Sequence, residues 1–161
     1  MHTPAEEKHD EGATSQLPAQ SIPAAAPTRE QIKRLEAEMR KLPQIELQTD
    51  HYFADGMYAR VVARPAGTVI VGKVHRKEHF YIVTKGSVQV TSDEGVKTLT
   101  AGSVLVSKPG TKRAVVALED SICMTVHRTD KTDLSEIEEQ LIEPDQEALF
   151  DSRNKLIGSE K

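Results

Sequence analysis

Histidine, lysine and arginine side chains occur at short spacings in two stretches of the sequence, where they could bind a metal ion or an anion. Lys73 and His75 are two positions apart, so they would face the same side of a β-strand. His79 opens the next predicted strand, with Tyr81 on the same face. Neutral imidazoles bind divalent transition metals, whereas ammonium and guanidinium groups bind carboxylates and phosphates. The pattern therefore indicates a polar site with two possible chemistries.

A further histidine ends the last predicted strand. Alternate positions of residues 122–127 form an apolar face, Ile122, Met124 and Val126, and a second face that carries His127. The apolar triplet is the better core face, which favours His127 outside the core. The mouth of a small barrel is partly polar, however, so His127 remains a candidate third imidazole.

The region that holds these residues, 51–128, has an apolar periodicity of two. Turn sequences such as Lys85-Gly86 and Pro109-Gly110 separate about eight short runs rich in Val, Ile and Thr. Short strands at this spacing predict an antiparallel sandwich or barrel rather than a parallel sheet. The predicted strands cover 58–63, 67–75, 79–84, 87–91, 96–99, 103–107, 113–117 and 122–127.

Helical segments flank this region. Within 28–50, Thr28 and Gln31 form a capping-box pattern, and a helix closed by Pro43 carries an apolar seam of Ile32, Leu35, Met39 and Leu42. Residues 129–161 are acidic, with one helix capped at Thr132 or Asp133 and a second expected over 146–157. Residues 1–27 are rich in Ala and Pro without apolar periodicity, so we expect a disordered tail.

Composition excludes several classes of protein. The single cysteine, Cys123, excludes an intrachain disulfide and a multi-cysteine zinc site, and in an apolar strand it is typical of a core residue. The apolar runs are too short to cross a membrane, and the N-terminus lacks a secretory signal, so we expect a cytoplasmic protein. Aromatic residues make up only 4% of the 161 residues, which argues against a nucleic-acid surface.

The charge is unevenly distributed. The net charge is −4, yet residues 51–128 hold eleven basic and six acidic side chains, and residues 129–161 hold four basic and ten acidic. A basic middle segment between acidic flanks is consistent with an anionic ligand, or with a basic surface facing acidic tails.

Residues 67–86 resemble the first of the two motifs of the cupin superfamily. That motif is a glycine, five residues, His-x-His, three or four residues, Glu, six residues and a glycine. Here Gly67 begins it and Gly86 ends it, and the spacing holds throughout. Lys73 stands where the first histidine belongs, His75 matches the second, and His79 stands where the glutamate belongs.

Residues 102–113 resemble the second cupin motif. Gly102 begins it, Pro109-Gly110 forms its turn, and Arg113 stands where a histidine ligand belongs. The resemblance covers about 55–128. It implies an all-β, double-stranded β-helix (jelly-roll barrel), often dimeric, whose members with intact motifs hold a divalent metal in the barrel mouth. The sequence also looks similar to small cupin-domain proteins of tailed phages.

Three hypotheses follow for the polar cluster. His75, His79 and His127 could bind a metal such as Zn, Fe, Mn or Ni, although Lys73 and Arg113 would place two positive charges beside it. Alternatively, a metal-free pocket of Lys73, His75, His79 and Arg113, lined also by Tyr81, could bind a small anion. In the third hypothesis the site has no chemistry and the barrel is a scaffold.

The sequence favours a non-enzymatic cupin-fold protein that acts through assembly or partner binding, or by binding a small anionic ligand. We expect a homo-oligomer with the apolar seam of residues 28–50 as the contact. If the gene belongs to a phage, its partners would be phage structural proteins, in the virion or the host cytoplasm. The alternative is a metal-dependent enzyme, dioxygenase- or isomerase-like, that uses His75 and His79.

Overall fold

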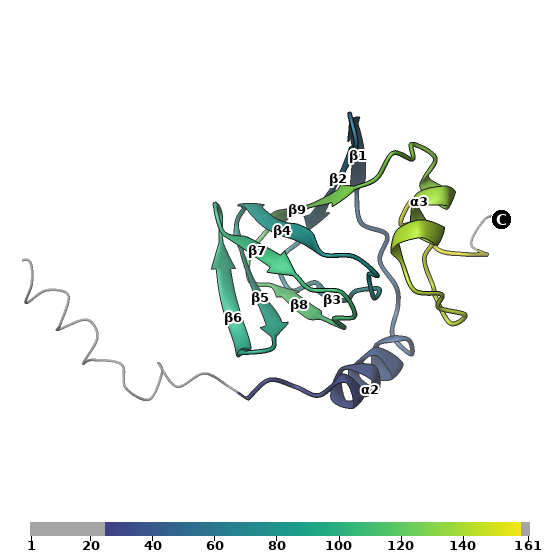
Figure 1. Ribbon diagram of the computed structural model, residues 1–161. Coiled ribbons are helices and arrows are strands. Elements are labelled where there is room, and N and C mark those ends of the chain that lie inside the picture. Colours follow the sequence, from purple (N-terminus) through teal and green to yellow (C-terminus); the bar gives the residue numbers. More distant parts are fainter. Residues whose placement is uncertain (1–24, 159–161) are drawn as a thin grey trace, which may run out of the picture.

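The computed structural model describes residues 25–158, in which strands predominate and two helices flank them (Figure 1). The predicted tail, residues 1–27, lies almost entirely outside this range. The helices are α2 (Arg29–Met39) and α3 (Leu134–Leu141). The strands are β1 (Thr49–Ala54), β2 (Met57–Arg64), β3 (Val69–Val71), β4 (His79–Lys85), β5 (Ser87–Ser92), β6 (Gly95–Thr100), β7 (Val104–Ser107), β8 (Ala114–Ala117) and β9 (Ser121–Arg128).

The strands form two antiparallel sheets with jelly-roll connections. One sheet has the order β1-β2-β9-β4-β7 and the other has the order β3-β8-β5-β6. The last strand, β9, pairs with both β2 and β4, and β8 pairs with β3 and β5, so the chain repeatedly crosses from sheet to sheet. The predicted all-β barrel with flanking helices is confirmed.

Inward side chains of both sheets form the core between them. Tyr81 and Val83 from β4 and Cys123 from β9 pack against Val88 and Val115 of the other sheet. Cys123 is a buried free thiol in this cluster, as the sequence predicted for a core residue. Closure of the two sheets over a small aliphatic core leaves one end of the barrel for polar side chains.

Gly86, the last residue of the first motif, makes a close approach between strands. It has a positive φ of 79°, in the region that favours glycine. A Cβ atom there would collide with Ser121 Oγ and would lie 2.5 Å from the carbonyl oxygen of Asp120. A glycine is therefore needed where β4 turns into β5 beside the start of β9.

The helix α2 begins as predicted and packs against its own chain. Thr28 and Gln31 form the reciprocal capping box, but the helix ends at Met39, before Pro43. Ile32 is buried, whereas Leu35 is 40% and Leu42 62% exposed, so only part of the apolar seam is covered.

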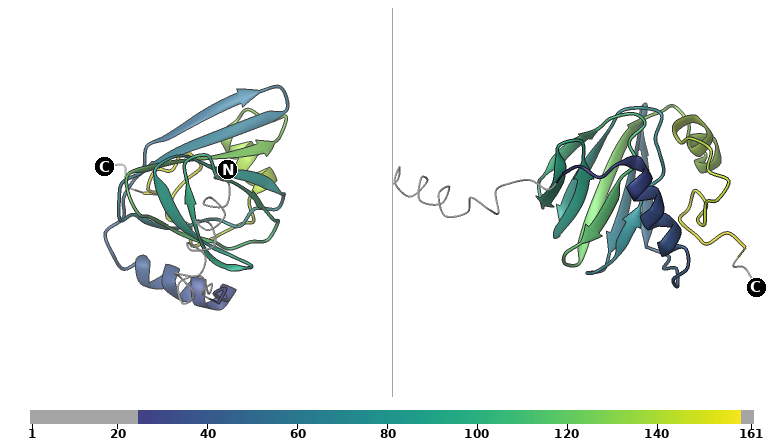
Figure 2. Two further views of the ribbon diagram at one scale, coloured as in Figure 1. Left: turned by 90° about the vertical axis from the view of Figure 1, so that its left-hand side faces the viewer. Right: turned by 90° about the horizontal axis from the view of Figure 1, so that it is seen from below.

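Ion pairs and hydrogen bonds join α2 to the loop before β8. Arg29 Nη1 donates to the carbonyl oxygen of Gly110 (3.0 Å), and the ammonium of Lys112 lies 3.2 Å from the carboxylate of Glu36. Figure 2 shows the helix lying along the side of the barrel. The loop before β8 is thus held in place from outside the barrel.

The helix α3 and the segment after it lie at one end of the barrel (Figures 1 and 2). Asp133 is the N-cap, and Ile137 and Leu141 pack against Tyr58. The backbone after α3 pairs with the loop after β3, through an isolated bridge between His75 and Ile142.

Three parts of the secondary structure differ from the sequence-based prediction. The strand expected over 67–75 spans only Val69–Val71, so His75 lies in the loop after it. The helix expected over 146–157 is absent, and these residues form turns and a bridge between Phe150 and Leu156. The strand β1 was not predicted, because this edge strand is largely exposed and shows little apolar alternation. No helix within residues 25–158 is long and apolar enough to cross a membrane.

Candidate metal centre and adjoining cavity

Three imidazoles meet at the end of the barrel that α3 covers. His75 lies in the loop after β3, His79 begins β4, and His127 lies near the end of β9. One ring nitrogen from each lies within 4.8 Å of those of the other two. The ring centroids are 4.3 Å apart for His75 and His79, 4.5 Å for His79 and His127, and 5.1 Å for His75 and His127.

His127 faces inward, which corrects the expectation that the apolar side of β9 is the core side. Cys123 and His127 are both buried on the inner face, and His127 is 5% exposed. The opposite triplet is only partly buried on the outer face, where Met124 pairs with Val61 and Val126 pairs with Phe80. Cross-strand apolar pairs on the outside of the sheet produced the misleading pattern.

Burial holds all three imidazoles in the neutral form. Burial, followed by the charges of His79 and Arg60, lowers the pKa of His75 to about 3. Burial, followed by His79 and His75 and then Arg60, lowers the pKa of His127 to about 3. Burial also lowers the pKa of His79. A neutral imidazole keeps a lone pair on one nitrogen, which metal coordination requires.

Hydrogen bonds orient the three rings. His79 Nδ1 donates to the carbonyl oxygen of Lys77 (3.2 Å), which leaves its Nε2 as the acceptor. The backbone of Lys73 forms a hydrogen bond with the His75 ring. His127 Nε2 lies 2.9 Å from Thr125 Oγ1. In each ring one nitrogen takes part in a hydrogen bond and the other does not. Hydrogen bonds orient the histidine ligands of metal sites in the same way.

The donor set fits a divalent transition metal. Three imidazoles suit Zn, Fe and Ni, and three protein ligands leave a coordination position open. The rings of His75 and His127 are nearly parallel, with an interplanar angle of 14°. A shared ion therefore requires rotation of a ring about χ2, a broad torsion for histidine.

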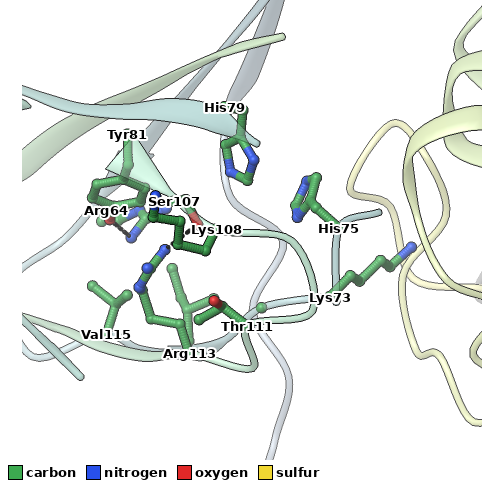
Figure 3. A pocket seen from close by; sticks show the side chains of 12 residues that line it. Arg64, Lys73, His75, His79, Tyr81, Ser107, Lys108, Thr111, Arg113 and Val115 are labelled. Carbon is green, nitrogen blue, oxygen red and sulfur yellow. Dashed lines mark hydrogen bonds between the residues drawn. The ribbon is translucent and has the colours of Figure 1, made fainter. Parts of the chain in front are cut away.

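Lys73 borders the same cavity as His75 and His79, but its ammonium group does not join the imidazoles as the sequence analysis expected. Its ammonium donates to Glu138 Oε1 on α3 (2.9 Å) and to the carbonyl oxygen of Phe150 (3.1 Å). Figure 3 shows the side chain directed away from His75 and His79, toward the C-terminal segment. The acidic helix therefore neutralises one of the two positive charges that would oppose a metal.

Arg113 and Tyr81 lie deeper in the barrel than the imidazoles, beside a cavity of about 70 Å³ (Figure 3). Arg113 Nη1 donates to Ser107 Oγ (3.0 Å). Burial raises the pKa of Tyr81, so the phenol stays protonated. The cavity is bordered by His75 and His79 as well, so it adjoins the three-histidine cluster.

Sequence reasoning missed Arg64, whose Nη1 donates to Tyr81 Oη (2.8 Å). It lines the same cavity from β2, on the inner face that also carries Tyr58 and Arg60. The signal was present as an alternation of Tyr58, Arg60, Val62 and Arg64. An inward arginine in a strand was not anticipated, because arginine is seldom buried.

Comparison with known proteins found similarity in structure only. No protein-family model matches the chain, and no curated protein matches it significantly.

The solved structures that resemble it include a cupin-2 domain containing protein of Shewanella frigidimarina, with 16% identity, a TM-score of 0.44, and coverage of 59% of this chain and 92% of that one. The cupin domain of Cnp3 from Schizosaccharomyces pombe has 18% identity and a TM-score of 0.46, covering 63% of this chain and 75% of that one. A cupin superfamily protein of Desulfitobacterium hafniense has 12% identity and a TM-score of 0.47, covering 68% of this chain and all of the other. The chain is thus similar to cupin-domain proteins over about 59–68% of its length.

Proposed function

We propose that the protein binds one divalent transition metal ion through His75, His79 and His127. The observation that carries this proposal is the meeting of three neutral imidazoles, two buried and that of His75 partly buried, with ligand nitrogens within 4.8 Å of one another. Buried polar groups are costly when they lack partners, so a cluster of this kind needs a reason to persist. A shared metal ion supplies that reason.

The chain's own groups prepare the centre in three ways. The carbonyl oxygen of Lys77 and the hydroxyl of Thr125 orient His79 and His127. The pairing of Lys73 with Glu138 removes a positive charge from the neighbourhood. The C-terminal segment covers this end of the barrel and limits access of water. When bound, an ion with an open position polarises a substrate oxygen or lowers the pKa of a bound water.

This proposal reverses the order of preference drawn from the sequence. The lysine and arginine at the two motif positions made a metal-free protein the leading hypothesis, but Lys73 is paired with Glu138, so of these two residues Arg113 alone keeps an unpaired charge. The dioxygenase- or isomerase-like activity depends on the same centre and stays a hypothesis. Assembly, partner binding and phage origin remain expectations from the sequence.

The test is the metal content of the purified, untagged protein and its affinity for Zn²⁺, Fe²⁺, Mn²⁺ and Ni²⁺. We compare wild type with His75→Ala/His79→Ala and with His127→Ala. His51→Ala is the matched control, because His51 lies beyond Tyr58, with which its ring stacks at 5.9 Å, and is not part of the cluster.

We expect stoichiometric metal in the wild type and the control. Loss of a hydrogen-bond partner of a ligand already weakens metal affinity by about tenfold to a hundredfold, so removal of a ligand itself should weaken it further or abolish it. If His127→Ala binds metal as tightly as the wild type, His127 is not a ligand, and this result would contradict the proposal. Failure of all four metals to bind the wild type would overturn it.

A further inference from the structure

The inner end of the cavity holds a buried guanidinium that its surroundings do not satisfy. Arg64 is 8% exposed, and its Nη1 donates to Tyr81 Oη. Its Nε is buried and has no hydrogen-bond partner, the single such side-chain atom found within residues 25–158. An unpaired donor on a buried cation is costly, so the fold retains Arg64 at a loss of stability.

A second guanidinium faces the same cavity from the opposite sheet. Arg113, directly before β8, donates from Nη1 to Ser107 Oγ (3.0 Å) and from Nε to the carbonyl oxygen of Thr91 (3.3 Å). The central carbons of the Arg64 and Arg113 guanidiniums lie 5.6 Å and 5.7 Å from the centre of the Tyr81 ring. Figure 3 shows both groups beside that ring.

These cations have no carboxylate partner. Among the described residues, no Asp or Glu oxygen lies within 4.0 Å of Arg64 or Arg113, nor of Arg60 on the same inner face. Asp93 acts on Arg113, and Glu138 on Arg60, only from a longer distance. Two guanidiniums around one cavity without a counter-ion therefore leave an excess of buried positive charge.

We propose that this cavity binds a small oxyanion, a carboxylate or a phosphate, between the guanidinium groups of Arg64 and Arg113. Arginine presents a planar fork of donors that matches both kinds of anion, and an anion in this cavity would balance the unpaired positive charge of the two guanidiniums that line it. The hydroxyls of Ser107 and Thr111 border the cavity as further donors.

The volume limits the size of the ligand. The cavity measures about 70 Å³. A single water needs at least about 10–15 Å³ on this measure, so the space holds roughly five to seven non-hydrogen atoms. Inorganic phosphate and oxalate are small enough to lie wholly within this space.

This inference goes beyond the metal centre and does not depend on it. The two arginines lie deeper than the histidines. Lys73 borders the cavity, as the sequence analysis expected, but its ammonium is paired with Glu138. An anion held here would border His75 and His79, since both also line the cavity. Its occupant would therefore lie next to any ion at the three histidines.

Isothermal titration of the full chain, after removal of metal with EDTA, tests the proposal. Sodium phosphate and sodium oxalate are titrated separately, with sodium chloride as the control for ionic strength. The variants are Arg64→Met, which removes the orphaned donor, and Arg113→Lys, which keeps the charge and loses the fork. Arg34→Met, at an exposed position of α2, is the matched control.

We expect saturable binding of at least one oxyanion but not of chloride, unchanged in Arg34→Met and about tenfold weaker or more in Arg113→Lys. The relative affinities of phosphate and oxalate identify the class of ligand. Failure of both to bind the metal-free wild type, or equal binding by wild type and Arg113→Lys, overturns the proposal.

Two further measurements separate this result from other causes. Circular dichroism verifies that each variant is folded, and Arg113→Lys decides the question if Arg64→Met does not fold. The titrations are repeated with His75→Ala/His79→Ala. Anion binding by this variant supports the arginine site, whatever the metal measurements give. Anion binding that is seen only when metal is present would show that the anion binds to the metal ion, and would contradict the arginine site.

Discussion

His75 and His127 make the stability of the metal-free protein depend on pH. Their pKa values are lowered to about 3 in the folded chain, whereas an ordinary histidine has a pKa of 6.5. At a pH between these two values, the two histidines bind more protons in the unfolded chain than in the folded chain. The stability that their neutral forms contribute is therefore complete above the unfolded pKa and is lost as the pH falls toward 3. We expect the free energy of unfolding to decrease by up to about 1.4 kcal/mol per pH unit for each histidine.

Urea denaturation of EDTA-treated protein at neutral and acidic pH measures this slope. The double variant His75→Ala/His127→Ala is the comparison, because every other titrating group is retained. We expect its stability to vary less steeply with pH in the acidic range. Parallel pH profiles for the wild type and the variant would contradict the assignment of the dependence to these two residues.

Some members of the candidate site could be predicted from sequence, and others could not. The resemblance of residues 67–86 to a cupin motif implied that His75 and His79 converge, and their rings lie 4.3 Å apart, although His75 is in the loop after β3 and not in a strand. His127 was ambiguous because β9 is apolar on its outer face, and strand periodicity alone does not say which face is inside. Arg64 and the partner of Lys73 were missed, since both depend on contacts between segments far apart in the chain.

At the scale of elements, α3 and the segment after it hold one of the proposed ligands in position. Arg76 N donates to the carbonyl oxygen of Leu141 and Glu143 N donates to that of Val74, both at 2.8 Å, on either side of His75. The apolar face of α3 anchors this pairing through Leu141, which is 2% exposed. The position of His75 therefore depends on packing between α3 and the barrel.

We predict that Leu141→Ala lowers both stability and metal affinity. Loss of a buried leucine side chain costs about 2–5 kcal/mol, and the pairing around His75 loosens with it. Leu42→Ala, at an exposed leucine, is the control and should change neither quantity. Urea denaturation and metal titration measure the two effects. Full metal affinity in a destabilised Leu141→Ala would show that α3 does not position His75.

The barrel strands could be predicted because apolar alternation and turn residues agree over residues 58–127. The prediction failed where one of these signals was missing. The edge strand β1 is largely exposed and lacks alternation. Residues 146–157 carry apolar side chains, but Asp151 accepts backbone hydrogen bonds from Arg153 and Lys155, so the segment folds into turns rather than a helix.

At the scale of the whole molecule, the self-association that we expect from the sequence depends on apolar side chains that remain exposed. Leu35 of α2 and Leu42, just after the helix, are exposed, which keeps the seam available as a contact between copies. We expect Leu35→Asp to reduce the mass measured by light scattering to that of a smaller species, with Arg34→Asp as the control. An unchanged mass would contradict the seam as the contact.

A second surface offers an alternative result for the same measurement. Phe80, Val104 and Val106 lie on the outer side of β4 and β7, with exposed fractions of 49%, 59% and 45%. A mass that falls in Val106→Asp but not in Leu35→Asp would move the contact from the helix to this sheet face.

The pairing between the segment after α3 and the loop that carries His75 has a consequence for the order of events during synthesis. The glycine, lysine and histidine of the first motif leave the ribosome early, but the strand with His127 and the residues that hold His75 follow about fifty to seventy positions later. Closing so long a loop is slow compared with forming local hairpins. The histidine cluster is therefore completed only after these distant segments have paired, and a chain truncated before Leu141 would lack the residues that hold the His75 loop.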